Sequence, residues 1–144
     1  MTIAAILKHK GDKVITVDPR DTVAIVAETL AANRIGAVLV IDRANQLMGI
    51  VSERDIVNSL HANGARTLEM TAGQLMTRAI HLAYPAMTVE EAMLKMTVSR
   101  IRHLPVMEHG IVIGLVSIGD VVKARIMTQE TEVDSMRAYI AGAA

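Results

Sequence analysis

The sequence has no cysteine, tryptophan or phenylalanine, and it has only two tyrosines among its 144 residues. Without cysteine the chain can form no disulfide, offers no thiolate nucleophile and binds no metal through sulfur. With so few aromatic side chains it has no platform for stacking nucleic-acid bases. Basic and acidic residues number 15 each, so no net positive field attracts a phosphate backbone. We therefore expect no nucleic-acid partner.

Long apolar runs are also missing, although 51% of the residues are hydrophobic. The runs Ala37–Ile41 and Ile111–Val116 have the length of strands, whereas a membrane-spanning helix needs roughly 18 or more apolar residues. Residues 1–10 lack the basic region, apolar stretch and cleavage site of a secretory signal. We expect a cytoplasmic protein with no membrane partner, whose surplus apolar surface is covered in a homodimer.

The chain contains an internal repeat. Six residues recur 66 positions later, namely Pro19, Thr22, Val23, Arg34, Ile35 and Val40. Five more recur 65 positions later, namely Gly49, Val51, Ser52, Asp55 and Val57. The lost residue falls in a predicted hairpin turn, where length changes are tolerated. Each copy predicts the order β-α-β-β-α. The predicted elements are Val14–Val17, a helix from Asp21 or Thr22 to about Asn33, Ala37–Ile41, Leu47–Val51 and Ser52–Leu60, and then Ile80–Ala83, Thr88–Ser99, His103–Met107, Ile111–Val116 and Ile118–Met127.

The repeat divides the chain into four parts. We expect a first unit at 1–65 that includes an N-terminal helix, a linker at 66–78, a second unit at 79–129 and a C-terminal tail at 130–144. Leu75-Met76 in the linker predicts a short docking helix. Neither unit buries much core alone. The predicted fold is therefore α/β (α+β), with the two units packed by pseudo-twofold symmetry.

The strongest local motif is Gly49–Asp55, which is matched by Gly114–Asp120. In each copy a strand runs into a helix N-terminus, where free N–H groups and about half a positive charge suit a phosphate. The Ser supplies a hydroxyl, and the Asp at the third helical position can accept hydrogen bonds from two ribose hydroxyls. The same Ser-x-x-Asp pattern is also close to a capping box that satisfies only the chain's own N–H groups. Both interpretations stay open.

The element order, the Pro after the first strand, the Gly-apolar-apolar-Ser-x-x-Asp ending and the tandem arrangement resemble the cystathionine beta-synthase (CBS) domain, twice. The resemblance runs from about Val14 to Met127. It implies a regulatory, energy-sensing module that binds AMP, ADP or ATP, with NAD(H) and S-adenosylmethionine as further candidates. It also implies that Asp55 and Asp120 hold the ribose, and that Ser52 and Ser117 lie near phosphate.

Carried over by position, the resemblance implies two sites. The first comprises Val14, Ile15, Thr16, Ala37, Val38, Ser52, Arg54 and Asp55. The second comprises Ile80, His81, Arg102, His103, Leu104, Pro105, Ser117, Gly119 and Asp120. Arg54 and Arg102 suit charge-assisted bonds to phosphate, or else are solvated surface residues. Because Gly119 replaces the cation of the first motif, we expect the two sites to differ in their ligands.

No catalytic machinery is evident. The five histidines form no helical pair and no cluster with carboxylates, so we expect no metal site. Ser52, Asp55 and His61 are triad residue types, but nine residues along a helix separate the ends of the set. Phosphate-loop and dinucleotide-binding patterns are absent. We expect a non-enzyme without catalytic cofactor that acts on an unidentified protein in trans; the alternative is a structural or interaction scaffold that binds no nucleotide.

Overall fold

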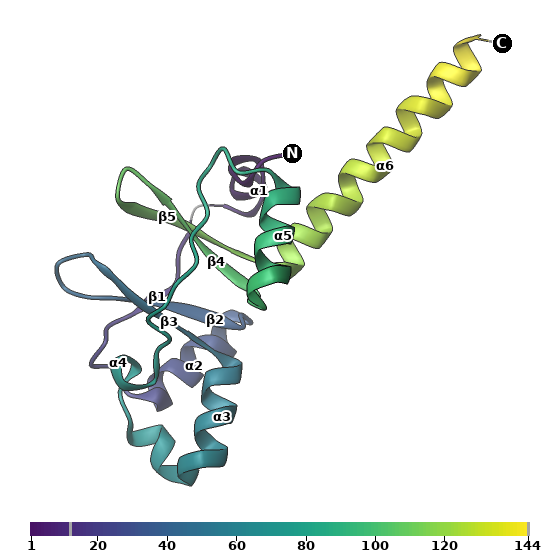
Figure 1. Ribbon diagram of the computed structural model, residues 1–144. Coiled ribbons are helices and arrows are strands. Elements are labelled where there is room, and N and C mark those ends of the chain that lie inside the picture. The colour runs from purple at the N-terminus through teal and green to yellow at the C-terminus, as the bar shows by residue number, and fades with distance from the viewer. Residues whose placement is uncertain (12, 144) are drawn as a thin grey trace. The chain divides into compact units, whose positions relative to one another are not determined.

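The structure, a computed structural model, describes residues 1–11 and 13–143 and contains two compact units (Figure 1). One unit consists of Val14–His81, and the other consists of Met1–Lys13 together with Leu82–Ala144. Each unit holds one copy of the repeat, one small sheet and one hydrophobic core. This confirms the predicted mixed α/β fold with two related halves.

The unit built on the first repeat has a three-stranded sheet in the order β1-β2-β3. β1 is parallel to β2, and β2 is antiparallel to β3. Its elements are β1 (Thr16–Val17), α2 (Val23–Asn33), β2 (Ala37–Ile41), β3 (Leu47–Ser52), α3 (Glu53–Asn63), a 3₁₀ helix (Gly64–Glu69) and α4 (Ala72–Leu75). The predicted first strand is shorter than expected, because only Thr16 and Val17 pair with β2.

The unit built on the second repeat has a two-stranded antiparallel sheet. Its elements are α1 (Ile3–Lys10), α5 (Val89–Ser99), β4 (His103–Glu108), β5 (Ile111–Ser117) and α6 (Ile118–Ala143). The strand predicted at Ile80–Ala83 is wrong, since only a single parallel bridge joins Ala83 to Val106. Two backbone bonds at Ala83 are too few to form a strand over Ile80–Ala83.

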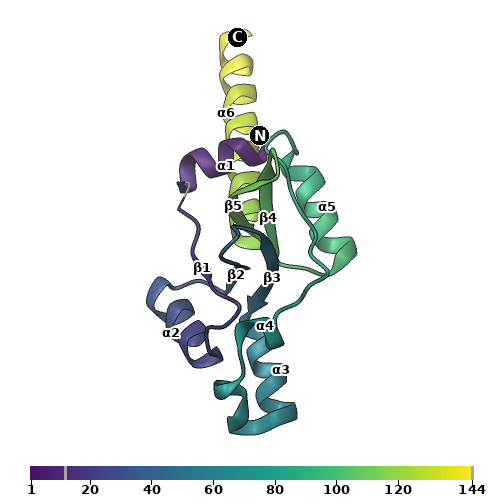
Figure 2. The same ribbon diagram turned by 90° about the vertical axis from the view of Figure 1, so that its left-hand side faces the viewer.

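The N-terminal helix α1 packs with the second repeat, although the sequence-based boundaries grouped it with the first. The amides of Ile3 and Ala4 donate to the carbonyls of Met87 and Pro85 at 2.9 and 3.0 Å. Figure 2 shows α1 beside β5. The linker packs on the first repeat in the same way that α1 packs on the second. The predicted docking helix exists as α4 and contacts β3. The helix α1, which precedes the first repeat in the chain, thus covers the second repeat. The helix α4, which precedes the second repeat, covers the first.

Two glycines of the repeat allow these covering segments to approach. A Cβ at Gly114 would lie 2.5 Å from Leu7 Cδ2, and one at Gly49 would lie 2.7 Å from Met76 Sδ. Gly49 and Gly114 are equivalent in the repeat and occupy matching places in β3 and β5. These two glycines are therefore packing positions.

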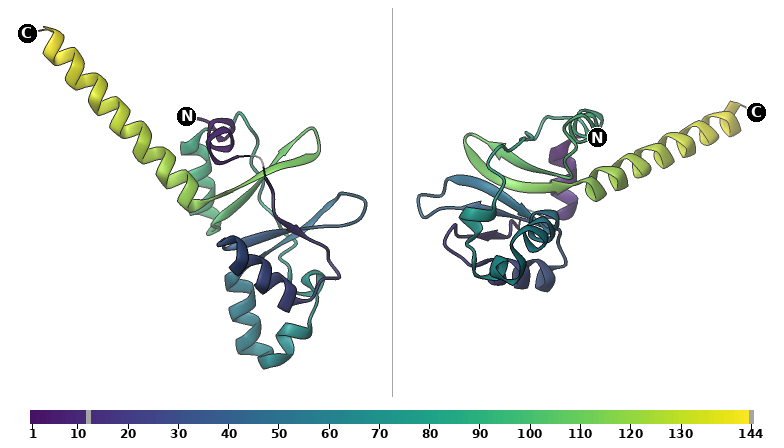
Figure 3. Two further views of the ribbon diagram at one scale, coloured as in Figure 1. Left: turned by 180° about the vertical axis from the view of Figure 1, so that it is seen from behind. Right: turned by 60° about the horizontal axis from the view of Figure 1, so that its bottom comes forward.

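Helix α6 begins at the predicted residue but runs 16 residues past the predicted end at Met127, to Ala143. Residues 130–143 of the segment expected as a C-terminal tail are therefore helical, and residue 144 lies outside the described residues. Figure 3 shows α6 continuing beyond the strands of its own unit. Within residues 1–11 and 13–143, no helix is both long and apolar enough to span a membrane.

Candidate functional site

The first candidate site lies at the N-terminus of α3, where β3 ends. The amide of Asp55 donates to Ser52 Oγ at 3.3 Å, and Asp55 Oδ2 accepts the Ser52 amide at 2.9 Å. The Ser52 hydroxyl also donates to Asp55 Oδ2, at 3.1 Å. Ser52 and Asp55 therefore form a capping box, which is one of the two interpretations that the sequence left open.

The other oxygen of Asp55 faces a residue that the sequence did not single out. The Thr77 hydroxyl donates to Asp55 Oδ1 at 3.3 Å. Thr77 is held there because its amide and carbonyl both pair with Ile50, at 2.9 and 3.1 Å. It lies in the linker outside the repeat, so no motif or periodicity pointed to it. Capping thus uses Oδ2, while Oδ1 is engaged only by this long hydroxyl contact among the described residues.

The second candidate site repeats this geometry at the start of α6. Asp120 Oδ2 accepts the Ser117 amide at 2.8 Å, and the Asp120 amide donates to Ser117 Oγ at 3.2 Å. Here a cation contacts the capping oxygen, because Lys10 Nζ of α1 lies 2.7 Å from Asp120 Oδ2. Lys10 also donates to the carbonyl of Leu115 at 2.8 Å. No motif or spacing pointed to Lys10, which is 110 residues away in the chain.

The ionisation of Asp120 reflects these contacts. Burial raises the pKa of this carboxyl, whereas the hydrogen bonds from Lys10 and from the Ser117 amide lower it. The hydrogen bonds and the Lys10 charge outweigh burial, so the pKa of Asp120 lies below its ordinary value. Asp120 is a carboxylate at neutral pH and can accept hydrogen bonds from a ligand.

The sheet register brings several of the first-site residues together. Ala37 is the β-partner of Ser52 and Val38 that of Val51, while Thr16 pairs with Leu39 on the other side of β2. Ala37 and Val38 are almost fully buried, at 1% and 0% exposed, so their side chains serve packing. The half-buried Val14 and Ile15 precede β1, and Arg54 is exposed.

The second-site residues are only partly brought together. His103 pairs with Ser117 across the hairpin, and the Ile118 amide donates to the carbonyl of Arg102 at 2.8 Å. Leu104 and Pro105 are buried in β4, while Arg102 and Gly119 are exposed. The remaining two predicted residues, Ile80 and His81, belong to the unit of the first repeat.

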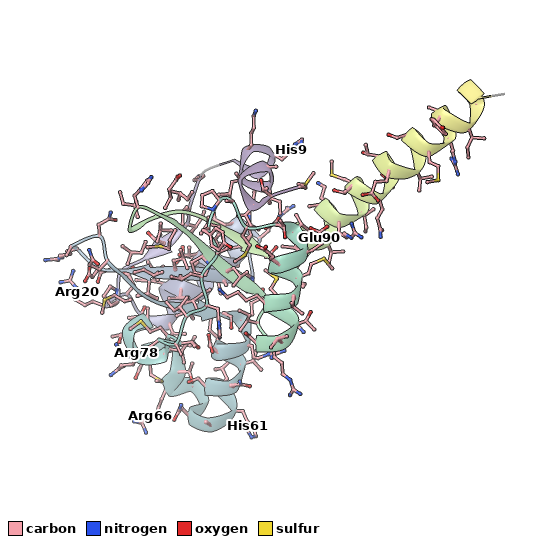
Figure 4. The ribbon with its side chains drawn as sticks, turned by 45° about the horizontal axis from the view of Figure 1, so that its top comes forward. His9, Arg20, His61, Arg66, Arg78 and Glu90 are labelled. Carbon is pink, nitrogen blue, oxygen red and sulfur yellow. The ribbon has the colours of Figure 1, made fainter. Side chains whose placement is uncertain are left out.

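A surface hollow of about 440 Å³ lies beside Asp120. It is lined by Met1, by Ile6, His9 and Lys10 of α1, and by Asp120, Lys123, Ala124 and Met127 of α6. Asp120 is the acidic member of this lining, and it stands among two lysines and a histidine. Figure 4 shows His9 at the end of α1. The hollow therefore combines apolar walls with cations that suit an anionic ligand.

The described residues offer little for catalysis. Within residues 1–11 and 13–143, no group of three or more His, Asp or Glu side chains gathers as metal ligands. His61 lies exposed in the last turn of α3 (Figure 4). Ser52 and Asp55 lie at the start of this helix. A hydrogen-bonded triad of these three residues is therefore not formed.

Comparison with known proteins adds three findings. The family model described as "CBS domain" matches residues 8–62 and 72–126. The mitochondrial CBS domain-containing protein CBSX3 of Arabidopsis thaliana is 34% identical, over 98% of this chain and 72% of its own length. Two longer Arabidopsis relatives are matched over only 21% and 20% of their length.

Solved structures show the same fold. The CBS-domain-containing protein ATU1752 from Agrobacterium tumefaciens is 39% identical, with a TM-score of 0.85 over 87% of this chain and 99% of that one. The CBS domain pair of MJ0100, crystallised with 5′-methylthioadenosine and S-adenosyl-L-methionine, is 24% identical, with a TM-score of 0.77 over 90% of this chain and 98% of that one.

Proposed function

The chain belongs to the CBS domain family, and because it carries two copies of this domain we propose that it is a regulatory module that binds an adenosine-containing ligand. The candidate ligands are AMP, ADP, ATP, NAD(H) and S-adenosylmethionine. Binding would bias the conformation or stability of the chain and thereby its action on a partner protein, which is thermodynamic linkage. The ligand is bound and released unchanged, so the proposed module is not an enzyme.

The observation that carries this proposal is that the two oxygens of each motif carboxylate have different roles. Asp55 and Asp120 cap their helices through Oδ2. Among the described residues, Oδ1 of Asp120 has no hydrogen-bond partner, and Oδ1 of Asp55 has only the 3.3 Å contact with Thr77. Capping and ribose binding are therefore compatible, because a ribose hydroxyl can donate to the second oxygen while the cap stays formed.

The chemistry around the two motifs also supports an adenosine ligand. Both motifs lie at helix N-termini, where the backbone favours a phosphate or carboxylate. Cations stand close by in sequence or space, with Arg54 in the first motif and Lys10 beside the second. The MJ0100 domain pair was crystallised with two adenosine compounds. The class that we propose here is the same.

The two sites are proposed to be unequal. In the first, Asp55 meets a neutral hydroxyl, whereas in the second Asp120 is held by the Lys10 ammonium at 2.7 Å. A ligand that reaches Asp120 must share the carboxylate with Lys10. We therefore assign to the second site a ligand whose phosphate or carboxylate can engage Lys10.

The remaining parts of the proposal concern partners and location. We propose a homodimer, since large apolar residues such as Leu94 and Val98 of α5 are 65% and 74% exposed. The regulated protein is reached in trans. A cytoplasmic location stays a prediction, because the Arabidopsis relative CBSX3 is mitochondrial.

A second candidate function is a scaffold that binds no nucleotide. It is favoured by the complete capping box at Ser52 and Asp55, which satisfies these residues without any ligand. Thermal unfolding of the purified chain with AMP, ATP, NAD and S-adenosylmethionine separates the two functions. A specific ligand at a hundredfold over its Kd adds about 2.7 kcal/mol to the free energy of unfolding. An unchanged melting temperature with all four compounds would establish the scaffold.

A further inference from the structure

The second half of α6 lies outside the packed part of its unit. Every residue from Gln129 to Gly142 is exposed. Figures 1 and 3 show this half running on past α1 and α5 with no other element of the unit beside it. It nevertheless carries large apolar side chains, including Met136 and Ile140, which are 66% and 62% exposed. A lone helix in water gains nothing from such residues, so they indicate a partner surface.

These apolar residues follow a heptad repeat. Ile126, Val133 and Ile140 are spaced by seven and occupy the a positions. The residue four places before each occupies d, which gives Val122, Gln129 and Met136. Five of these six positions are apolar over nearly three heptads, and all six side chains are exposed. β-Branched residues at every a position are typical of parallel two-stranded coiled coils.

The charges that flank this stripe match the same arrangement. In the heptad, Arg125 and Glu132 fall at g, and Glu130 and Arg137 fall at e. A parallel pair in register places each g residue opposite the e residue of the next heptad on the other helix. Arg125 then meets Glu130 of the second copy, and Glu132 meets Arg137 of the second copy. Every such pair has opposite charges.

An antiparallel pair has the opposite electrostatics. It places e opposite e and g opposite g. In the register that aligns all six a and d positions, Glu130 meets Glu130, Glu132 meets Glu132 and Lys123 meets Arg137. Like charges at close range disfavour this orientation.

We propose that residues 122–140 of α6 from two copies of this chain form a parallel two-stranded coiled coil. The proposal rests on the homodimer of the proposed function and adds the α6 surface to it, in addition to the exposed apolar residues of α5; ligand binding does not depend on it. In a single chain Arg125 lies 3.3 Å from Glu90, which Figure 4 places where α5 meets α6. That exposed pair is weak and can exchange for Glu130 of the second copy. The Glu132–Arg137 pair involves no such exchange and is the better one to test.

The absence of cysteine from the full chain gives a direct test. Met136→Cys places a single thiol at d, where two helices in parallel register bring equivalent residues within disulfide range. Ser135→Cys places the same thiol one residue away on the outer face. Under mild oxidation, we expect the first variant to form the covalent dimer about tenfold faster or more. Equal rates overturn the coiled coil.

A charge exchange tests orientation. We expect Glu132→Arg and Arg137→Glu each to raise the dimer Kd on the order of tenfold, since two attractive pairs become repulsive. Mixing the two variants restores every attraction and should restore the wild-type Kd. Asp134→Arg makes the same charge change at an outward position and should leave the Kd unchanged. If the mixture stays as weak as the separate variants, the parallel coiled coil is wrong.

Sedimentation and ligand-induced thermal shifts keep this proposal separate from the proposed function. A dimer that persists without preferential crosslinking at residue 136 contradicts the coiled coil and assigns dimerisation to another surface. A chain that crosslinks at residue 136 yet shows no thermal shift with any adenosine compound supports the coiled coil and contradicts the ligand-binding function.

Discussion

Lys10 and Asp120 form an ion pair at 2.7 Å although 110 residues separate them in the chain. The contact exists because α1 packs onto the second repeat, with Leu7 over Gly114. It connects the N-terminal helix to the acidic residue of the second ligand motif. Any ligand that competes for Asp120 therefore acts on the packing of α1 as well.

The pair makes stability depend on pH in a defined direction. The pKa of Asp120 is lowered, so its contribution to stability is present above the ordinary carboxyl pKa and is lost as pH falls through the lowered value. We expect Lys10→Met to cost less than about 1 kcal/mol at pH 7, because the pair is partly exposed. The difference from wild type should shrink as pH falls from about 5 toward 2. Urea unfolding across this range measures it.

The control for this experiment is Lys123→Met. Lys123 lines the same hollow, but no hydrogen bond joins it to Asp120 among the described residues. We expect its removal to leave the carboxyl titration of Asp120, followed by NMR, close to that of the wild type. A titration of Asp120 that is unchanged in Lys10→Met would contradict the assignment of the pKa shift to this pair.

Replacing the motif carboxylates separates capping from ligand binding. Asp55→Ala removes a helix cap and should cost about 1 kcal/mol of stability without ligand. Where the same carboxylate holds a ribose, the variant should also lose the thermal shift that the ligand gives the wild type. Asp120→Ala should behave alike at the second site. Calorimetric titration of each variant with the best ligand of the thermal screen measures the affinity.

Asp42→Ala is the matched control, because Asp42 Oδ1 accepts the Gln46 backbone amide at 2.9 Å in the hairpin turn between β2 and β3, which contains neither motif. It should lose stability while keeping the ligand-induced shift. Full affinity in both Asp55→Ala and Asp120→Ala would show that neither carboxylate holds the ribose.

The two packing glycines should differ in their tolerance of alanine. A Cβ at Gly49 would lie 2.8 Å from the Thr77 carbonyl oxygen, which is backbone, whereas at Gly114 the near atoms belong to the Leu7 side chain. Overpacking costs about 1–3 kcal/mol, and a flexible side chain relieves it more readily than backbone. We expect Gly49→Ala to destabilise more than Gly114→Ala. Thermal unfolding of both variants measures the difference.

Gly119→Ala controls for the loss of glycine itself. Its Cβ would meet only Ser117 Oγ at 3.6 Å, and alanine favours the helix that it joins by up to about 1 kcal/mol. It should therefore be neutral or stabilising. Equal losses at positions 49 and 114 would show that the covering segments adjust to the same extent.

How far the sequence predicted this structure depends on the range of each interaction. The helix after Thr22 and the hairpins were predicted correctly, because helix caps and turns depend on residues that are close in sequence. The repeat also shows each of these patterns twice. The strand predicted at Ile80–Ala83 is wrong, because a strand requires hydrogen bonding to a neighbouring strand and not only residue propensity. Of these residues, only Ala83 has a bridge partner.

The sites show the same limit. Ser52 and Asp55 form a local box that spacing alone indicates. Thr77 and Lys10 reach their carboxylates only through packing of segments outside the repeat, so no spacing rule identifies them. The length of α6 was missed because its end was taken from the repeat, which stops near Met127, while the apolar heptad of α6 continues to Ile140.

The last prediction concerns Arg54, which distinguishes the first motif from the second. Arg54 is exposed on the first turn of α3, and within the described residues it forms no ion pair. At a helix N-terminus its guanidinium can form charge-assisted bonds to phosphate. We expect Arg54→Gln to weaken AMP and ATP about tenfold, the loss of one charge-assisted bond, while adenosine binds as before.

Arg66→Gln provides the comparison, because Arg66 is an exposed arginine of the same unit that lies in the 3₁₀ helix after α3 (Figure 4). It removes the same charge from the surface and should leave AMP affinity unchanged at physiological salt. If adenosine weakens as much as AMP in Arg54→Gln, the arginine supports the fold of the site and does not contact phosphate. If both arginine variants weaken AMP equally, the effect is one of general surface charge.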